Sequence, residues 1–403
     1  AHSTQEDAGL QGGQVWSLAL DAQGAVWMAH GDSPIRGRGI AVLDYGGTLD
    51  DWASWQTDDT WRYLGFDGVD GRSDALITVM ERGQDGTWLL GAKDDANGDG
   101  LGMRLYDEAS GLWTPLRVSD TGPPSSRVSD IAVDPGSGAV WFSLRNRGVA
   151  RLDPATNAWT WWRAYQNVAV VANTIAIAET DSRRIQVDLA DQAAYDRAFP
   201  SRPAFARVGA DPTLYEVTGY SPRRSGAGPY IYVSPVLAHS AAEGAEVFAV
   251  TRGPASNVAR KIAVAPDGSV WVGGGLSMWR QGPLPGSQCE DYPQCWIDGG
   301  LGHWDGAAWS VYNESNSRLP TNGIGAIEVG AVKVDAAGRV WAATGDGNSN
   351  GDGVGVLDPS SGQWQLHRYA DGVTAGDGAA DIEIDPATGN VWMAHHPVIG
   401  YIA

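Results

Sequence analysis

The feature that most constrains the fold is a short unit that recurs along the chain and ends each time at a tryptophan. Every copy has an apolar alternation, a turn that contains glycine, and a second apolar stretch. The copies end at Trp27, Trp88, Trp141, Trp271, Trp341 and Trp392. Period-two apolar residues around Asp, Gly and Pro predict strand, tight turn, strand. Because the tryptophans recur at one strand position, we expect them to be core wedges.

A second motif follows most copies, and it joins a glycine to an apolar alternation that ends in aspartate. It reads GIAVLD from Gly39, GMRLYD from Gly102, GVARLD from Gly148, GLGHWD from Gly300 and GVGVLD from Gly353. A turn and an aromatic strand come next in most units. One unit therefore contains four short antiparallel strands, which is the make-up of a β-propeller blade.

The spacing of the tryptophans sets the number of blades. The gap from Trp141 to Trp271 is about twice the others, so a blade without its tryptophan is expected between them. We predict a single all-β domain over 1–403, a seven-bladed β-propeller of four-stranded antiparallel blades, with six or eight blades as alternatives. The irregular region 166–254 is predicted to be a degenerate blade with an insertion.

Inside this irregular region we expect an inner hairpin at 173–189 and the one plausible helix at 191–198. At the other end of the chain, the last unit stops at Ala403 after its third strand. Because an open sheet edge invites aggregation, residues before Gln14 are expected to supply the fourth strand. Further chain beyond Ala403 is the alternative.

The repeat resembles two known families. Segments such as DIAVDPGSGAVWFSLRNRGVARLDPATNAW, residues 130–159, resemble the extracellular two-component-regulator propeller repeats and the blades of the streptogramin (virginiamycin B) lyase family. The first resemblance implies a ligand-binding ectodomain, and the second implies a metal-dependent enzyme that opens a cyclic peptide lactone. No catalytic motif of the lyase is matched, so no catalytic residue is carried over.

Charge and cysteine content narrow the setting. With 28 basic and 48 acidic residues the net charge is −20, which disfavours nucleic acid and favours cations or neutral partners such as glycans. No apolar run is long enough for a membrane helix, so membrane insertion is not expected. The start at Ala1, without Met, resembles the product of signal-peptide removal and predicts a secreted, extracellular or cell-surface protein; a chain given from a later start is the alternative.

A loop insertion at 281–299 carries both cysteines of the chain, Cys289 and Cys295. In a secreted protein two cysteines this close are expected to form a disulfide that closes a small loop. Two unrelated thiols are the alternative. Their spacing does not suit a zinc knuckle.

The loops between second and third strands share one face of a propeller, and two of them suggest calcium. Alternating oxygen side chains with intervening glycines are typical of a loop that curls around a hard cation. The first loop carries Asp346, Asn348, Asn350 and Asp352. The second loop carries Asp95, Asn97 and Asp99, with Lys93 in the first ligand position. The alternative is a hairpin turn, which uses the same residue types.

Histidines give a further candidate on the same face. His30 and His395 each lie three residues after a repeat tryptophan, near Asp32 and His396 respectively. If the first and last blades are neighbours, these side chains approach one point, where they can hold a metal or supply acid–base catalysis. Structural histidines at strand ends are the alternative reading. His303 and His367 fall within predicted strands and are expected to be structural.

Two functions follow as hypotheses. The first is a secreted non-enzymatic propeller that binds an extracellular protein, a glycan or further copies of itself, with calcium-stabilised loops. It rests on the acidic composition, on loops that vary over a constant scaffold, and on the lack of a catalytic constellation. The second is a metal-dependent lyase or hydrolase that uses His30, His395 and His396.

Overall fold

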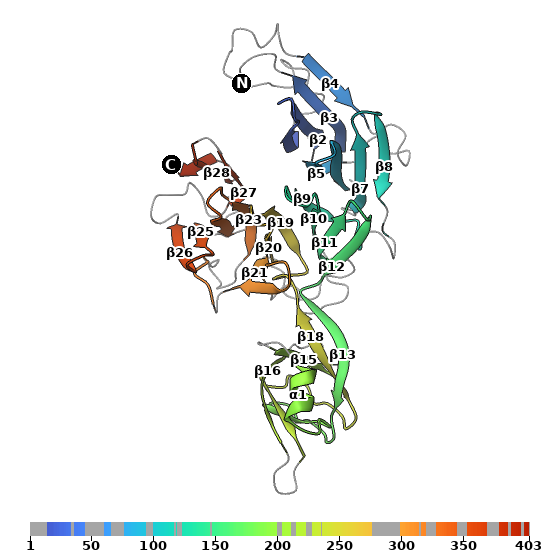
Figure 1. The fold of residues 1–403 in the computed structure, drawn as a ribbon, viewed down its shortest axis with the longest axis vertical. Coiled ribbons are helices and arrows are strands. Elements are labelled where there is room, and N and C mark those ends of the chain that lie inside the picture. Colours follow the sequence, from blue (N-terminus) through green and yellow to red (C-terminus); the bar gives the residue numbers. More distant parts are fainter. Residues whose placement is uncertain are drawn as a thin grey trace. The chain divides into compact units, whose positions relative to one another are not determined.

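The computed structural model describes most of the chain as β-strands. It describes residues 14–33, 36–44, 60–65, 76–93, 100–116, 118, 123–145, 147–199, 204–210, 215–222, 228–234, 236–275, 299–313, 316–319, 328–344, 353–368, 379–385, 388–395 and 399–402. These residues form seven sheets and one helix (Figure 1). They divide into two compact units, and the second consists of the described residues of Trp162–Gly253. The remaining described residues make up the first unit.

Six of the seven sheets lie in the first unit, and we number them in chain order. Sheet 1 contains β1 (Gln14–Leu20), β2 (Val26–Ser33), β3 (Arg36–Asp44) and β4 (Thr60–Leu64). Sheet 2 contains β5 (Leu76–Arg82), β6 (Thr87–Lys93), β7 (Gly100–Asp107) and β8 (Leu112–Leu116). Sheet 3 contains β9 (Val128–Val133), β10 (Val140–Leu144), β11 (Gly148–Asp153) and β12 (Ala158–Trp162).

The other three sheets of this unit follow the insertion in the chain. Sheet 4 contains β19 (Ala259–Val264), β20 (Val270–Gly274), β21 (Gly300–Trp304) and β22 (Trp309–Tyr312). Sheet 5 contains β23 (Val329–Val334), β24 (Val340–Thr344), β25 (Gly353–Asp358) and β26 (Gln363–Arg368). Sheet 6 contains β27 (Ala379–Ile384), β28 (Val391–His395) and β29 (Ile399–Ile402).

In all six sheets, strands that follow one another in the chain pair side by side and antiparallel. The predicted all-β fold of antiparallel propeller blades is therefore confirmed. Sheet 6 has three described strands, as its sequence predicts. The fourth strand expected from residues before Gln14 lies outside the described residues.

The Asp and Gly residues that predict turns in the repeat do form the turns that join the strands of the blades. At the turn between first and second strands, the Asp21 carboxylate accepts hydrogen bonds from the backbone N–H of Gln23 and of Ala25, both at 2.9 Å. Gly24 then takes a φ of 92°, which favours glycine. The aspartate that ends the second motif does the same at the next turn, where Asp358 accepts from the backbone of Ser360 at 2.9 Å. Many of the acidic residues are thus turn caps.

The first strands of the six sheets pack against one another in the order β1, β5, β9, β19, β23, β27. Each carries one β-bulge near its start, which bends the strand and re-aims its side chains. We call these the inner strands. Because β9 contacts β19 directly, sheets 3 and 4 are neighbours although the second unit separates them in the chain.

The repeat tryptophans fill the space between sheets, with one offset. Five of them pair with the next-to-last residue of the inner strand, as Trp27 does with Ala19. Trp88 instead pairs with Arg82, the last residue of β5. Alternate strand residues face opposite sides, so Trp88 points back toward sheet 1 and stacks on Trp27 with ring centroids 4.2 Å apart. The expectation of a single strand position for all six tryptophans is wrong for Trp88.

Burial confirms the wedge role for five of these tryptophans, which are at most 5% exposed. Trp392, in sheet 6, is 45% exposed. Its neighbours Val391 and Met393 pack in the core shared with sheet 5, so the Trp392 side chain lies on the opposite face of sheet 6. On sheet 1, Leu18 and Leu20 are also exposed, at 63% and 60%.

The second unit departs from the repeat, as the irregular sequence predicts. Its sheet has six strands in the order β13-β18-β15-β16-β17-β14. They are β13 (Tyr165–Asn173), β14 (Arg184–Gln186), β15 (Ala204–Val208), β16 (Tyr215–Ser221), β17 (Tyr230–Ser234) and β18 (Glu246–Arg252). The hairpin expected at 173–189 is reduced to a single bridge between Thr174 and Val187, because β14 pairs with β17.

The predicted helix is confirmed as α1 (Gln192–Ala198), and it begins where the Asp191 carboxylate accepts a hydrogen bond from the backbone of Ala194. Tyr195 and Phe199 anchor it in a core that belongs to this unit alone. Among the described residues, no helix is long and apolar enough to cross a membrane.

Candidate functional site

Most of the residues proposed from the sequence as sites lie outside the described part of the chain. This is so for both calcium loops, with Asp346, Asn348, Asn350, Asp352, Asp95, Asn97 and Asp99. It also applies to Cys289, Cys295 and His396. The calcium loops and the disulfide therefore stay predictions.

Of the histidine group, His30 is placed in β2, where it is 1% exposed and lies edge-on to the Tyr63 ring at 6.3 Å. For His395 the structure gives the backbone, which pairs with Ala379 in sheet 6. A meeting of these side chains stays a prediction. His303 stacks on Trp271 at 4.0 Å and His367 on Trp341 at 5.8 Å, as expected of structural histidines.

A different group of charged side chains comes together on the inner strands. We call it the axial cluster. It consists of Glu81 in β5, Asp130 in β9, Lys261 in β19, Lys333 in β23, and Asp381 and Glu383 in β27. No helix or loop contributes, so the positions of these side chains are set by the strands that carry them.

When the inner strands are aligned by their pairing after the β-bulge, these six residues fall at two equivalent strand positions, which we call levels. The next-to-last residues are Ala19, Glu81, Ala132, Ala263, Lys333 and Glu383. Two positions earlier are Ser17, Val79, Asp130, Lys261, Ala331 and Asp381. At each level three strands carry a charge, whereas the other three carry Ala, Ser or Val. The blade itself therefore needs no charge at either level.

Ion pairs connect the cluster between strands. The Lys333 ammonium lies 2.9 Å from a Glu383 carboxylate oxygen, and the Lys261 ammonium lies 3.2 Å from Asp381. Asp130 accepts a hydrogen bond from the Ile262 backbone at 3.0 Å. The side chains of Lys333, Asp381 and Glu383 are 40%, 55% and 72% exposed, so water reaches this part of the cluster.

The electrostatics show that charges from separate strands act on one another. Burial, followed by the negative charge of Asp130, raises the pKa of Glu81 to about 7. Lys333 and Glu383, from β23 and β27, also act on this carboxyl group. Burial raises the pKa of Asp130. Although burial alone disfavours its charge, the carboxylates of Asp130 and Asp381 raise the pKa of Lys261.

The axial cluster mixes donors and acceptors over a small region that solvent reaches. Such a surface can bind a ligand that presents hydroxyl groups or charges of both signs. In the described part of the chain, no three His, Cys, Asp or Glu side chains are arranged to hold a metal ion.

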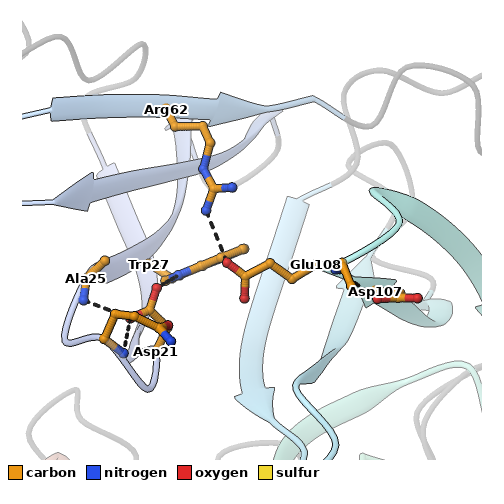
Figure 2. A network of polar contacts seen from close by, with 8 residues as sticks. Asp21, Ala25, Trp27, Arg62, Asp107 and Glu108 are labelled. Atoms are coloured by element: carbon orange, nitrogen blue, oxygen red, sulfur yellow. Dashed lines mark hydrogen bonds and ion pairs between the residues drawn. The ribbon is translucent and has the colours of Figure 1, made fainter.

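A pocket of about 610 Å³ lies elsewhere, between the turns of sheets 1 and 2. Its walls include Asp21, Arg62, Asp107 and Glu108 (Figure 2). Asp21 accepts from the Trp27 indole N–H at 3.0 Å, and Arg62 pairs with Glu108 at 3.4 Å across the two sheets. These polar groups cap turns and join blades, so their roles are explained by the fold. The axial cluster is therefore the stronger candidate.

Reasoning from the sequence alone missed the axial cluster, although the signal was present in the aligned repeats. Glu81 and Lys333 occupy a position at which other copies have alanine. A comparison of equivalent positions, rather than a search for local motifs, would have found them. The two candidate calcium loops stand out in the sequence instead, because their composition is unusual.

Comparisons with known proteins leave the family of this chain undefined. No protein-family model matches it, and no curated protein matches it. Among solved structures it is similar to the extracellular domain of a hybrid two-component system from B. thetaiotaomicron, with 11% identity, a TM-score of 0.28, and coverage of 100% of this chain and 63% of that one.

Two further examples among the similar solved structures are an extracellular domain and an enzyme. The extracellular domain of a one-component system from B. thetaiotaomicron is 12% identical with a TM-score of 0.24, over 99% of this chain and 49% of that one. A gluconolactonase from Xanthomonas campestris is 15% identical with a TM-score of 0.39, over 96% of this chain and 84% of that one. The chain thus spans less than two thirds of each of the two extracellular domains.

Proposed function

We propose that this protein is a non-enzymatic extracellular binding module whose axial cluster holds a small polar ligand, with the sugar unit of a glycan as the class that fits best. One observation carries the proposal. Charged side chains stand at inner-strand levels that the repeat fills with Ala, Ser or Val in other sheets. Partly buried charges cost folding free energy, so a role beyond folding explains their presence.

The nature of the cluster supports a polar ligand that carries hydroxyl groups. Lys261 and Lys333 offer donors, whereas Asp381 and Glu383 offer acceptors within 3.2 Å of them. A sugar presents hydroxyl groups that both donate and accept, so it can bridge such pairs. The acidic chain, with its net charge of −20, supports an extracellular partner of this kind over nucleic acid.

The test uses the residues that the repeat itself supplies. The double variant Glu81→Ala with Lys333→Ala gives both positions the residue found at Ala132 and Ala263. The matched control, Glu243→Ala with Arg197→Ala, removes one charge of each sign from exposed sites in the second unit. Binding of neutral sugars, sugar acids and amino acids is measured by calorimetry.

We expect a ligand from this panel to bind the wild type and the control equally, and to bind the axial double variant at least about tenfold more weakly, as the loss of charged hydrogen bonds predicts. Equal binding by all three proteins contradicts the proposal. So does a panel in which no compound binds the wild type.

We also propose that calcium stiffens the loops at 346–352 and 95–99, on the sequence alone. Metal analysis of the dialysed protein is expected to find calcium, and a chelator is expected to lower the melting temperature. The variant Asp346→Ala with Asp352→Ala should lose this response. Absence of calcium together with an unchanged melt would remove the proposal.

A hydrolase or lyase is the alternative function, and the raised pKa of Glu81, at about 7, is what favours it. A carboxyl group that titrates near neutral pH can act as a general acid or base. Activity on lactones, cyclic depsipeptides or acidic polysaccharides, lost in Glu81→Gln, would support this alternative. The absence of turnover on all three classes would reject it.

A further inference from the structure

Three arginines and one glutamate gather where the inner strands begin, close to the axial cluster. Arg127 directly precedes β9, Arg145 follows β10, and Arg260 is the second residue of β19. Glu328 directly precedes β23. We call these four residues the arginine group. In a chain of net charge −20, this group has three positive charges and one negative charge.

Backbone and side-chain contacts hold the group in place. The Arg145 backbone N–H donates to the Arg127 carbonyl at 3.0 Å, and the Ser143 hydroxyl donates to the Arg260 carbonyl at 3.0 Å. Arg260 forms an ion pair with Glu328, whose side chain is 2% exposed. The Arg260 Nε also donates to the Gly275 carbonyl at 3.2 Å. Strands, rather than long loops, thus set the spacing of these side chains.

The balance of charge in the group is positive. Burial, followed by the like charges of Arg260 and then Arg127, lowers the pKa of Arg145, and Glu328 opposes this with a smaller effect. Although its guanidinium group is partly buried, Arg145 is exposed to solvent overall, so a solute can reach it. A bound anion would relieve the repulsion among the arginines, because a guanidinium group binds carboxylate or phosphate oxygens in a forked geometry.

We propose that the arginine group binds the acidic group of the ligand, so that the ligand is a sugar acid whose hydroxyl groups lie over the axial cluster. This rests on the proposed binding function and specifies its ligand. The order along the inner strands supports it, because Arg260 is adjacent in sequence to Lys261, and Asp130 follows Arg127 by three residues. Carboxylate and phosphate are both oxyanions that the arginine group could bind, and the test below distinguishes between them.

The test compares D-galacturonate with D-galactose, which differ in one carboxylate, and with inorganic phosphate. Calorimetry is run on the wild type, on Arg145→Gln, and on the control Arg197→Gln, which removes an exposed arginine of helix α1 in the second unit. Arg145 is chosen because its backbone bond survives the substitution. Circular dichroism verifies that each variant is folded.

We expect galacturonate to bind the wild type and the control at least about tenfold more tightly than galactose, and Arg145→Gln to lose this preference, as expected for a charge-assisted hydrogen bond. Equal binding of galactose and galacturonate by the wild type overturns the inference, as does an unchanged preference in Arg145→Gln. Phosphate that binds at least as tightly as galacturonate also overturns it, since phosphate is then the preferred oxyanion.

The axial double variant of Glu81 and Lys333 separates this inference from the proposed function. If galactose binding depends on the axial cluster while Arg145→Gln has no effect, the binding module stands and the acidic ligand is wrong. If the axial double variant leaves the binding of both galactose and galacturonate unchanged while Arg145→Gln weakens the binding of galacturonate, the anion site stands and the axial site is wrong.

Discussion

Asp130 shows how one residue can serve the fold and the site together. Its carboxylate accepts a hydrogen bond from the backbone of Ile262 in the next sheet at 3.0 Å. At the equivalent place in sheet 1, the Ser17 hydroxyl accepts from the backbone of Met80 at 3.0 Å. The structural task therefore needs an oxygen acceptor and not a charge. What Asp130 adds to that task is the negative charge that acts on Glu81 and Lys261.

This comparison predicts different outcomes for two substitutions. Asp130→Ser keeps an acceptor for the Ile262 N–H, whereas Asp130→Ala leaves that N–H without this acceptor. We expect Asp130→Ala to be less stable than Asp130→Ser by about 1–2 kcal/mol in urea unfolding. Both variants remove the charge, so each serves as the control for the other. Equal stabilities would show that the hydrogen bond between sheets contributes nothing measurable.

A second prediction concerns the glycine that begins the second motif. Gly353 has a φ of 132°, and a Cβ there would lie 2.1 Å from the His367 carbonyl oxygen. Gly353→Ala is therefore expected to cost about 2 kcal/mol or more in unfolding free energy. Gly136→Ala, whose nearest neighbour would be 3.4 Å away and whose φ is not positive, is the control and should change stability by less than about 0.5 kcal/mol. Similar losses in both would refute the steric argument.

At the scale of strands and sheets, the local repeat was enough to predict blades, turns and the helix α1. Apolar alternation and Asp–Gly turn chemistry act over a few residues, so they can be read directly. The offset of Trp88 was missed although the sequence shows it, because Trp88 lies two residues after the turn glycine Gly86, whereas Trp27 lies three residues after Gly24. The two turns have the same length, with five residues between the last paired residues of each hairpin. The strands with which β13 and β14 pair could not be predicted, because pairing between segments far apart in the chain depends on the whole sheet.

The second unit is joined to the first through two strands that run side by side. In this unit Gly253 donates a backbone hydrogen bond to Ala164 at 2.8 Å, and Tyr165 is paired with Arg252. Replacement of 165–252 by a two-residue Asn-Gly turn is therefore expected to leave the first unit folded. Its near-ultraviolet circular dichroism and a cooperative melt are the measurements. Loss of both would show that the blades need the insertion to fold.

At the scale of the whole molecule, the sequence predicts the blades but not which of their charged side chains face one another. Glu81 and Lys333 are far apart in the chain, and the effect of Lys333 on the Glu81 carboxyl group follows only from the packing of the inner strands. The functional loops chosen from composition lie outside the described residues. The candidate site found in the structure lies on strands, where equivalent positions of the repeat differ in charge.

The Glu81 carboxyl group also predicts a dependence of stability on pH. Its pKa is raised in the folded protein, so its contribution to stability is present below its ordinary value of 4.5 and is lost as pH rises through about 7. Turn caps such as Asp335, whose pKa is lowered, act in the opposite sense and lose stability in acid. Relative to the wild type, Glu81→Gln should gain stability between pH 5 and 7, measured by urea unfolding. A constant difference across that range would contradict the assignment.

The most direct test of the central claim is the titration of the Glu81 side-chain carboxyl by carbon-13 NMR, assigned with Glu81→Gln. If the inner strands bring the axial cluster together, Glu81 titrates at about pH 7, and Asp130→Ser lowers its midpoint by removing a neighbouring negative charge. A midpoint near the ordinary 4.5, unmoved by Asp130→Ser, would mean that these charges do not share one site.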